Sequence, residues 1–136
     1  MRAVLDPNVI ISAVLSSKGA PAGILRAWLD GAFELVVSPL LLEELERALG
    51  YPKLRQSVSA MEAAELLNLL RRAASNESDP TPAPARVPDP GDDYLIALAE
   101  ATRARLVSGD AHLLGLAAQL PIESPAAFLK RIEGQD

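Results

Sequence analysis

Four acidic residues stand where a folded chain ordinarily places apolar side chains. Asp6 and Asp110 each follow a short apolar run typical of a buried strand, and Glu44 and Asp92 lie on the apolar sides of two predicted helices. A buried carboxylate is unfavourable unless it is hydrogen-bonded, protonated or bound to a cation. These four residues are therefore candidate catalytic groups and candidate ligands of a divalent metal ion.

The chemistry expected of such a set is hydrolysis of a phosphodiester by a metal-activated water. Carboxylates gathered in one place raise one another's pKa, and a hard cation such as Mg²⁺ or Mn²⁺ relieves that repulsion. Two such ions about 3.5–4 Å apart can stabilise both the attacking and the leaving oxygen. No histidine base is needed, and the single histidine, His112, is predicted to lie on a helix surface.

Two of the acids also have a simpler interpretation as helix caps. Pro7 favours an extended conformation for Asp6, but proline is equally common at the first position of a helix. Asp110 is likewise a possible N-cap. Polar neighbours support the site interpretation, since Asn8 could hold the Asp6 carboxylate or a water on a metal, and Ser108 could bond a nearby carboxylate or ligand.

A helical wheel separates Glu44 from its acidic neighbours. In the helix expected at residues 38–49, Glu44 falls inside the apolar arc, whereas Glu43 and Glu46 fall outside it. The alternative is that Glu44 lies at the edge of the arc and reaches water.

The same reasoning selects Asp92 in the helix expected at residues 92–102. Asp92 points to the side that carries the apolar residues, whereas Asp93 is expected on the solvent side with Glu100. The alternative is that Asp92 only complements the positive end of the helix dipole.

The elements that must position these residues alternate between strands and helices. Strands are predicted at residues 3–5, 33–37 and 105–107 and around Ile122, and helices at 9–15, 21–30, 38–49, 59–74, 92–102, 111–118 and 125–132. This alternation predicts an α/β fold with a parallel sheet covered by helices on both faces. Because ligands bind beyond the carboxyl ends of parallel strands, that edge would gather the acids.

The proline-rich stretch at residues 75–91 is predicted to be an extended surface connection within one domain, residues 1–136, because too few residues follow it for a second domain. In the helix before it, the apolar residues expected on one side are Met61, Ala64, Leu67 and Leu70.

The amino-acid composition excludes several classes of protein and site. The 136 residues are 49% hydrophobic and include no cysteine, which supports one core and excludes a thiolate metal site. The absence of cysteine also fits a cytoplasmic protein, and no apolar run approaches a membrane span or a signal peptide. The net charge of −5 argues against nonspecific nucleic-acid binding by bulk charge, but an acidic nuclease site remains compatible with it.

The chain carries four ordered segments: DPNVIISAVLS at 6–16, SPLLLEELERAL at 38–49, DPGDDYLIALA at 89–99 and LVSGDAHLL at 106–114. In this order and spacing they resemble the PIN domain, and within it the toxins of VapBC-like toxin–antitoxin systems. Each segment is a weak signal alone, whereas the ordered set is specific and spans nearly the whole chain.

The resemblance implies a three-layer α/β/α sandwich around a mainly parallel sheet of about five strands. It further implies a Mg²⁺- or Mn²⁺-dependent ribonuclease, with RNA as substrate, a small antitoxin as partner and a homodimer as the assembly. The family's acidic residues match Asp6, Glu44, Asp92 and Asp110, and its polar supporting positions match Asn8 and Ser108. The chain departs from the pattern at Pro7, where the family often has threonine, and in the proline-rich stretch.

Two other function classes stay open. A PIN fold could serve as an RNA- or protein-binding module without turnover, although the intact acidic set argues against this. Signalling receivers and aspartate phosphatases also place acids at strand ends. However, Asn8 stands where a phosphatase needs its second aspartate, and no lysine follows the strand at 105–107. Basic residues that could grip RNA are Arg26, Lys53, Arg55, Arg71, Arg72, Arg103 and Arg105.

Overall fold

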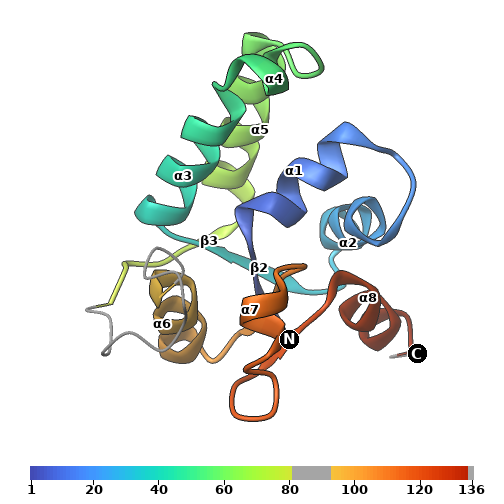
Figure 1. The fold of residues 1–136 in the computed structure, drawn as a ribbon, viewed down its shortest axis with the longest axis vertical. Helices are drawn as coiled ribbons and strands as arrows, with labels where there is room; N and C mark the ends of the chain where they lie inside the picture. Colours follow the sequence, from blue (N-terminus) through green and yellow to red (C-terminus); the bar gives the residue numbers. More distant parts are fainter. Residues whose placement is uncertain (81–92, 135–136) are drawn as a thin grey trace.

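A computed structural model describes residues 1–80 and 93–134 of the chain (Figure 1). In these ranges the chain order is β1 (Arg2–Leu5), α1 (Pro7–Leu15), α2 (Ala20–Leu29), β2 (Glu34–Val37), α3 (Pro39–Leu49), α4 (Pro52–Arg55), α5 (Ala60–Ala73), β3 (Ser75–Asn76), α6 (Asp93–Thr102), β4 (Arg105–Val107), α7 (Ala111–Leu114), β5 (Ile122–Glu123) and α8 (Pro125–Glu133).

The strands form one five-stranded sheet in the order β3-β2-β1-β4-β5, and all four pairings are parallel. The central strand β1 places Val4 beside Val36 on one side and beside Leu106 on the other. The chain builds outward from β1 through β2 to β3 and then returns to add β4 and β5. The predicted α/β fold with a parallel sheet is confirmed, and the gap between the ends of β1 and β4 is its topological switch point.

Helices cover both faces of the sheet, which gives the three-layer arrangement. Helices α3 and α5 lie on one side of the strands, whereas α6 lies on the other and packs on β1 and β4 (Figure 1). The core between the layers is mostly aliphatic. Its one aromatic pair among the described residues is an edge-to-face contact of Phe33 with Phe128, whose ring centres lie 5.1 Å apart.

The helices begin where local sequence favours them. Ser38 caps α3 by accepting a hydrogen bond from the Leu41 backbone N–H, and Pro39 follows at the first helical position. Ser59 and Glu62 form a reciprocal capping box at the start of α5. The boundaries predicted for these two helices are therefore confirmed to within a residue.

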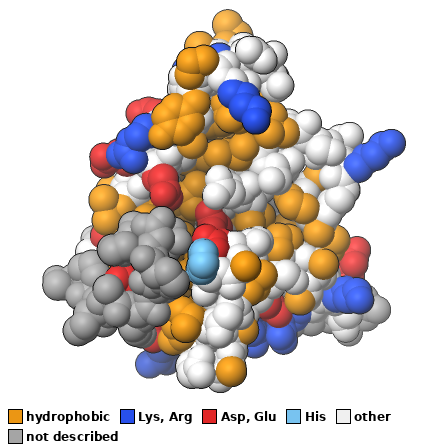
Figure 2. All heavy atoms as spheres, in the orientation of Figure 1, with side chains coloured by type: hydrophobic (Ala, Val, Ile, Leu, Met, Phe, Trp, Pro, Cys, Tyr) orange, Lys and Arg blue, Asp and Glu red, His pale blue; other side chains and the backbone are white. Residues whose placement is uncertain are grey.

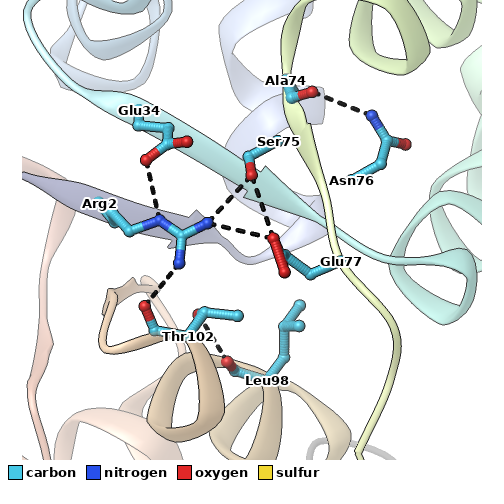
Figure 3. Close-up of polar contacts among 8 residues, drawn as sticks. All are labelled: Arg2, Glu34, Ala74, Ser75, Asn76, Glu77, Leu98 and Thr102. Carbon is cyan, nitrogen blue, oxygen red and sulfur yellow. Dashed lines mark hydrogen bonds and ion pairs between the residues drawn. The ribbon is translucent and has the colours of Figure 1, made fainter.

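Arg2 joins the sheet to α6 beneath β1 (Figure 3). Its guanidinium donates hydrogen bonds to Glu34 Oε2 at 2.9 Å, to the Thr102 carbonyl at 2.8 Å and to Ser75 Oγ at 3.0 Å, and it also pairs with Glu77 Oε2 at 3.4 Å. One side chain thus ties β1, β2, β3 and the carboxyl end of α6 together.

The structure differs from the sequence expectations in four elements. The stretch predicted as an irregular connection opens with edge strand β3, while residues 81–91 lie outside the described part of the chain. Helix α4 was not predicted, and α7 ends at Leu114 rather than at residue 118. In α5 the buried residues are Ala63, Leu66, Leu67 and Leu70, and Met61 and Ala64 are exposed, so the prediction that these two share one side with Leu67 and Leu70 is wrong.

Within the described ranges, no single helix has the length and apolarity to cross a bilayer. The pair α1 and α2, bent by 96°, meets such a test together, by length and composition only.

Candidate functional site

Asp6 lies directly after β1, at the switch point of the sheet. Its backbone N–H donates to the Val107 carbonyl at 2.9 Å, which continues the pairing of β1 with β4 by one step. Its side chain is only 6% exposed. Oδ1 accepts from the Asn8 backbone N–H at 3.0 Å, and Oδ2 accepts from Ser108 Oγ at 2.8 Å. Two separate hydrogen bonds therefore fix the orientation of this buried carboxylate.

Ser108 connects the two acidic loops. It is fully buried after β4, and its Oγ accepts a hydrogen bond from the Asp110 backbone N–H at 3.0 Å while donating to Asp6. Asp110 in turn caps α7, because its Oδ1 accepts from the His112 backbone N–H at 2.8 Å. The chain thus brings the predicted residues Asp6, Ser108 and Asp110 together, and both acids are also helix caps.

Asp6 and Asp110 open onto one cleft of about 360 Å³. It is lined by Asp6, Asn8, Val9, Ser12, Pro21, Gly109, Asp110 and Pro125. Figure 2 shows acidic side chains beside the pale-blue histidine side chain on this face. His112 itself is exposed, as predicted, and does not line the cleft.

Burial raises the pKa of Asp6 above its ordinary value of 3.8, and the negative charge of Asp110 adds to this rise. The hydrogen bonds from Asn8 and Ser108 act in the opposite direction. A cation in the cleft would remove the unfavourable burial of charge. Burial therefore disfavours the charged form of Asp6, and a positive ligand would offset that cost.

Glu44 extends from α3 towards α6. It is half-buried, whereas Glu43 and Glu46 are exposed, so the helical wheel separated the three correctly. Tyr94 Oη donates a hydrogen bond to Glu44 Oε2 at 2.5 Å. The predicted alternative, in which Glu44 simply reaches water at the edge of the arc, accounts for its partial exposure but leaves this bond unexplained.

Tyr94 and Asp79 were missed by the sequence reasoning. The pKa of Tyr94 is raised by burial, by its hydrogen bond to Glu44 and by the charges of Glu44, Asp6 and Asp79. Asp79 Oδ2 accepts from the Leu40 backbone N–H at 2.9 Å, and its buried Oδ1 has no hydrogen-bond partner among the described residues. The position of Tyr94 directly after two aspartates was the available signal.

Two predictions on α6 have different outcomes. Asp92 lies outside the described residues, so its place in the site stays a prediction. Asp93 was expected on the solvent side, and this is wrong, because it is 8% exposed. The physical reason is that α6 is buried over a wide arc, including five consecutive residues from Leu95 to Ala99, so a narrow apolar stripe does not define its inner side.

The described residues bring together only some of the predicted metal ligands. Within residues 1–80 and 93–134, no three acidic, histidine or cysteine side chains gather closely enough to hold an ion. The cleft unites Asp6 with Asp110, whereas Glu44 does not line it, and the charges of Glu44 and Asp6 both act on Tyr94. These donors are all oxygens, and the buried Asp6 carboxylate carries a charge penalty that a cation offsets. The donor set therefore fits a hard divalent ion.

Comparison with known proteins gives a family match. The family model described as "PIN domain" matches residues 2–112. A search of curated proteins found no significant match.

Solved structures share the fold at low identity. PAE2754 from Pyrobaculum aerophilum is 19% identical with a TM-score of 0.68, covering 99% of this chain and 91% of its own. VapBC2 from Rickettsia felis, bound to a DNA fragment from its promoter, is 14% identical with a TM-score of 0.61 and coverages of 91% and 98%. VapBC-1 from nontypeable Haemophilus influenzae is 17% identical with a TM-score of 0.61 and coverages of 93% and 99%.

Proposed function

Because this chain belongs to the PIN domain family, we propose that it is a metal-dependent endoribonuclease and the toxin of a toxin–antitoxin pair. PIN domains are generally nucleases, which supports the reaction class. The observation that carries the proposal is the placement of Asp6 and Asp110, joined by the buried Ser108, at one cleft at the switch point of the sheet. Ligands of open parallel sheets bind at that place.

The cofactor proposed is Mg²⁺ or Mn²⁺, held by Asp6 and Asp110, with Glu44 and Asp92 completing the set. When bound, such an ion supplies Lewis-acid activation of water and charge stabilisation for phosphodiester hydrolysis. The protein's own part is orientation: Ser108 and the Asn8 backbone hold the two Asp6 oxygens in fixed directions. Burial raises the pKa of Asp6, so a positive ligand beside it would favour its charged form.

The proposed substrate is RNA, and the proposed partners are a small antitoxin and a second copy of the chain. The VapBC structures from Rickettsia felis and Haemophilus influenzae, which share this fold, support a toxin–antitoxin assignment. Arginines of an antitoxin could pair bidentately with the exposed sides of the cleft carboxylates. The net charge of −5 would not attract RNA to the chain as a whole. Contacts to the RNA phosphates would therefore come from individual basic residues.

The proposal is tested by incubating the purified chain with assorted RNAs in Mn²⁺ or Mg²⁺, with and without chelator. Cleavage is expected with either metal and is expected to fall by at least about a hundredfold in Asp6→Asn and Glu44→Gln, because each removes a proposed ligand charge. Glu46→Gln is the matched control, since Glu46 lies on the same helix but is exposed. Equal cleavage in chelator, or full activity in both site variants, would refute the proposal.

A binding module without turnover is the second candidate. The observation that favours it is the lack of a three-ligand cluster among residues 1–80 and 93–134. Calorimetric binding of Mn²⁺ or of a non-cleaved RNA, with no product from any RNA after prolonged incubation, is the outcome expected of this alternative.

A further inference from the structure

Tyr94 stands among carboxylates from three separate parts of the chain. Its hydroxyl donates to Glu44 of α3, and the charges of Asp6 after β1 and of Asp79 before α6 act on the same hydroxyl. The ring lies on the first turn of α6 and packs against the hydrophobic core. Tyr94 is therefore a neutral donor fixed inside an acidic surrounding.

The support behind Tyr94 is rigid. Helix α6 packs on the central strands β1 and β4, and Arg2 holds its carboxyl end through the Thr102 carbonyl (Figure 3). Glu44, in contrast, has a long side chain that is only half-buried on α3. Without a partner, such a side chain would sample several rotamers, and fixing it would cost entropy when it bound a ligand.

The Tyr94 hydrogen bond occupies one oxygen of the Glu44 carboxylate and leaves the other oxygen unbonded within the described residues. Tyr94 bonds Oε2 of Glu44, and within the described residues Oε1 makes no hydrogen bond or ion pair. A lysine or arginine in place of Tyr94 would also orient Glu44, but its charge would neutralise the carboxylate and compete with a cation. A phenol donates a hydrogen bond and brings no positive charge.

We propose that Tyr94 is a positioning residue, whose hydroxyl holds Glu44 Oε2 so that Oε1 stays available to a divalent cation in the acidic site. The inference rests on the proposed function, because it assumes that Glu44 is a ligand. Groups that orient metal ligands typically change metal affinity by about 10–100-fold when they are removed.

The first experiment measures Mn²⁺ binding by the free-ion electron paramagnetic resonance signal. Tyr94→Phe keeps the ring and its packing but removes the hydroxyl, so we expect Mn²⁺ affinity to fall by about 10-fold or more with little change in melting temperature. Tyr51→Phe is the matched control, because Tyr51 is the other tyrosine of the chain and is 54% exposed. Unchanged Mn²⁺ affinity in Tyr94→Phe, or no Mn²⁺ binding by the parent protein, would overturn the inference.

The second experiment follows Tyr94 itself. Since the chain has two tyrosines, the Tyr51→Phe protein carries Tyr94 as its sole tyrosine. We expect Mg²⁺ to change the near-ultraviolet difference absorbance of that protein and the change to disappear when Glu44→Gln is added. A response that survives Glu44→Gln would show that the cation does not act through the Tyr94–Glu44 pair, and would contradict the inference.

The two hypotheses fail in different ways. Mn²⁺ binding that depends on both Glu44 and Tyr94, without cleavage of any RNA, would refute the nuclease and retain the role of Tyr94. Metal-dependent cleavage that is lost in Glu44→Gln, with unchanged Mn²⁺ affinity in Tyr94→Phe, would retain the nuclease and refute the role of Tyr94.

Discussion

At the scale of single residues, Asp6 combines two roles that seemed to be alternatives in the sequence. One oxygen caps α1 through the Asn8 backbone, and the other is held by Ser108, at the wall of the cleft. Capping offsets part of the cost of burying the carboxylate, and this allows the chain to keep a charge where a ligand can use it. The same pair of hydrogen bonds therefore caps α1 and orients the Asp6 carboxylate at the cleft.

The raised pKa of Asp6 predicts how its stability contribution varies with pH. The folded state holds the proton more tightly than the unfolded state, so protonation of Asp6 stabilises the fold below the ordinary pKa of 3.8. That contribution is lost as pH rises through the folded-state pKa. In chelator, the melting temperature of the parent should therefore fall relative to that of Asp6→Asn as pH rises above about 3.8, because asparagine does not ionise.

Differential scanning fluorimetry across this pH range measures the effect. Asp30→Asn, at an exposed helix end, is the matched control for replacing an aspartate by asparagine. A difference between Asp6→Asn and the parent that shrinks as pH rises would contradict the burial argument.

At this scale the sequence predicted that Asp6, Ser108 and Asp110 lie together, because each lies within three residues of a strand that pairs in the sheet centre, whereas their catalytic role stays a prediction. The sequence reasoning missed Asp79 and Tyr94. Asp79 accepts a hydrogen bond from the backbone of α3, which lies far from it in the sequence, and Tyr94 bonds a partner 50 residues away. Such contacts arise from tertiary packing, which local patterns do not encode.

At the scale of elements, the helical wheel separated the half-buried and exposed acids of α3 correctly. The apolar side predicted for α5 was wrong. Residues 61, 64, 67 and 70 repeat every three positions and drift around a helix with 3.6 residues per turn. The buried stripe of α5 instead combines spacings of three and four, at Ala63, Leu66, Leu67 and Leu70. Strand β3 escaped prediction because two residues carry no periodicity, and its pairing with β2 defines it.

The Arg2 cluster predicts a stability effect on these elements. Arg2→Met keeps much of the aliphatic stem but removes hydrogen bonds to β2, β3 and α6, so we expect a loss of about 1–3 kcal/mol in the free energy of unfolding. The estimate is modest because the Arg2 side chain is 28% exposed.

Urea denaturation measures the loss, and Arg47→Met provides the control. Arg47 pairs with Glu43 on the surface of α3, where both side chains are more than half exposed, and its removal should change the free energy by under about 0.5 kcal/mol. Equal effects of the two substitutions would show that the Arg2 cluster is no more than a surface ion pair.

At the scale of the whole molecule, topology explains why distant acids meet. The chain leaves β1 in one direction to build β2 and β3 and returns to build β4 on the opposite side. The loops after β1 and β4 must then diverge, and the cleft opens between them. Alternating strand and helix patterns were enough to predict this parallel arrangement, whereas the strand order required the structure.

A cleft built this way predicts that metal binding stabilises the entire fold. An ion that binds only the folded state adds RT ln(1 + [L]/Kd), or about 2.7 kcal/mol at a hundredfold excess over Kd. We therefore expect Mn²⁺ to raise the melting temperature of the parent by several degrees and to leave Asp6→Asn nearly unchanged. NaCl at matched ionic strength controls for screening, and an equal rise in NaCl would mean that Mn²⁺ acts on the surface charge of −5 and not on the cleft.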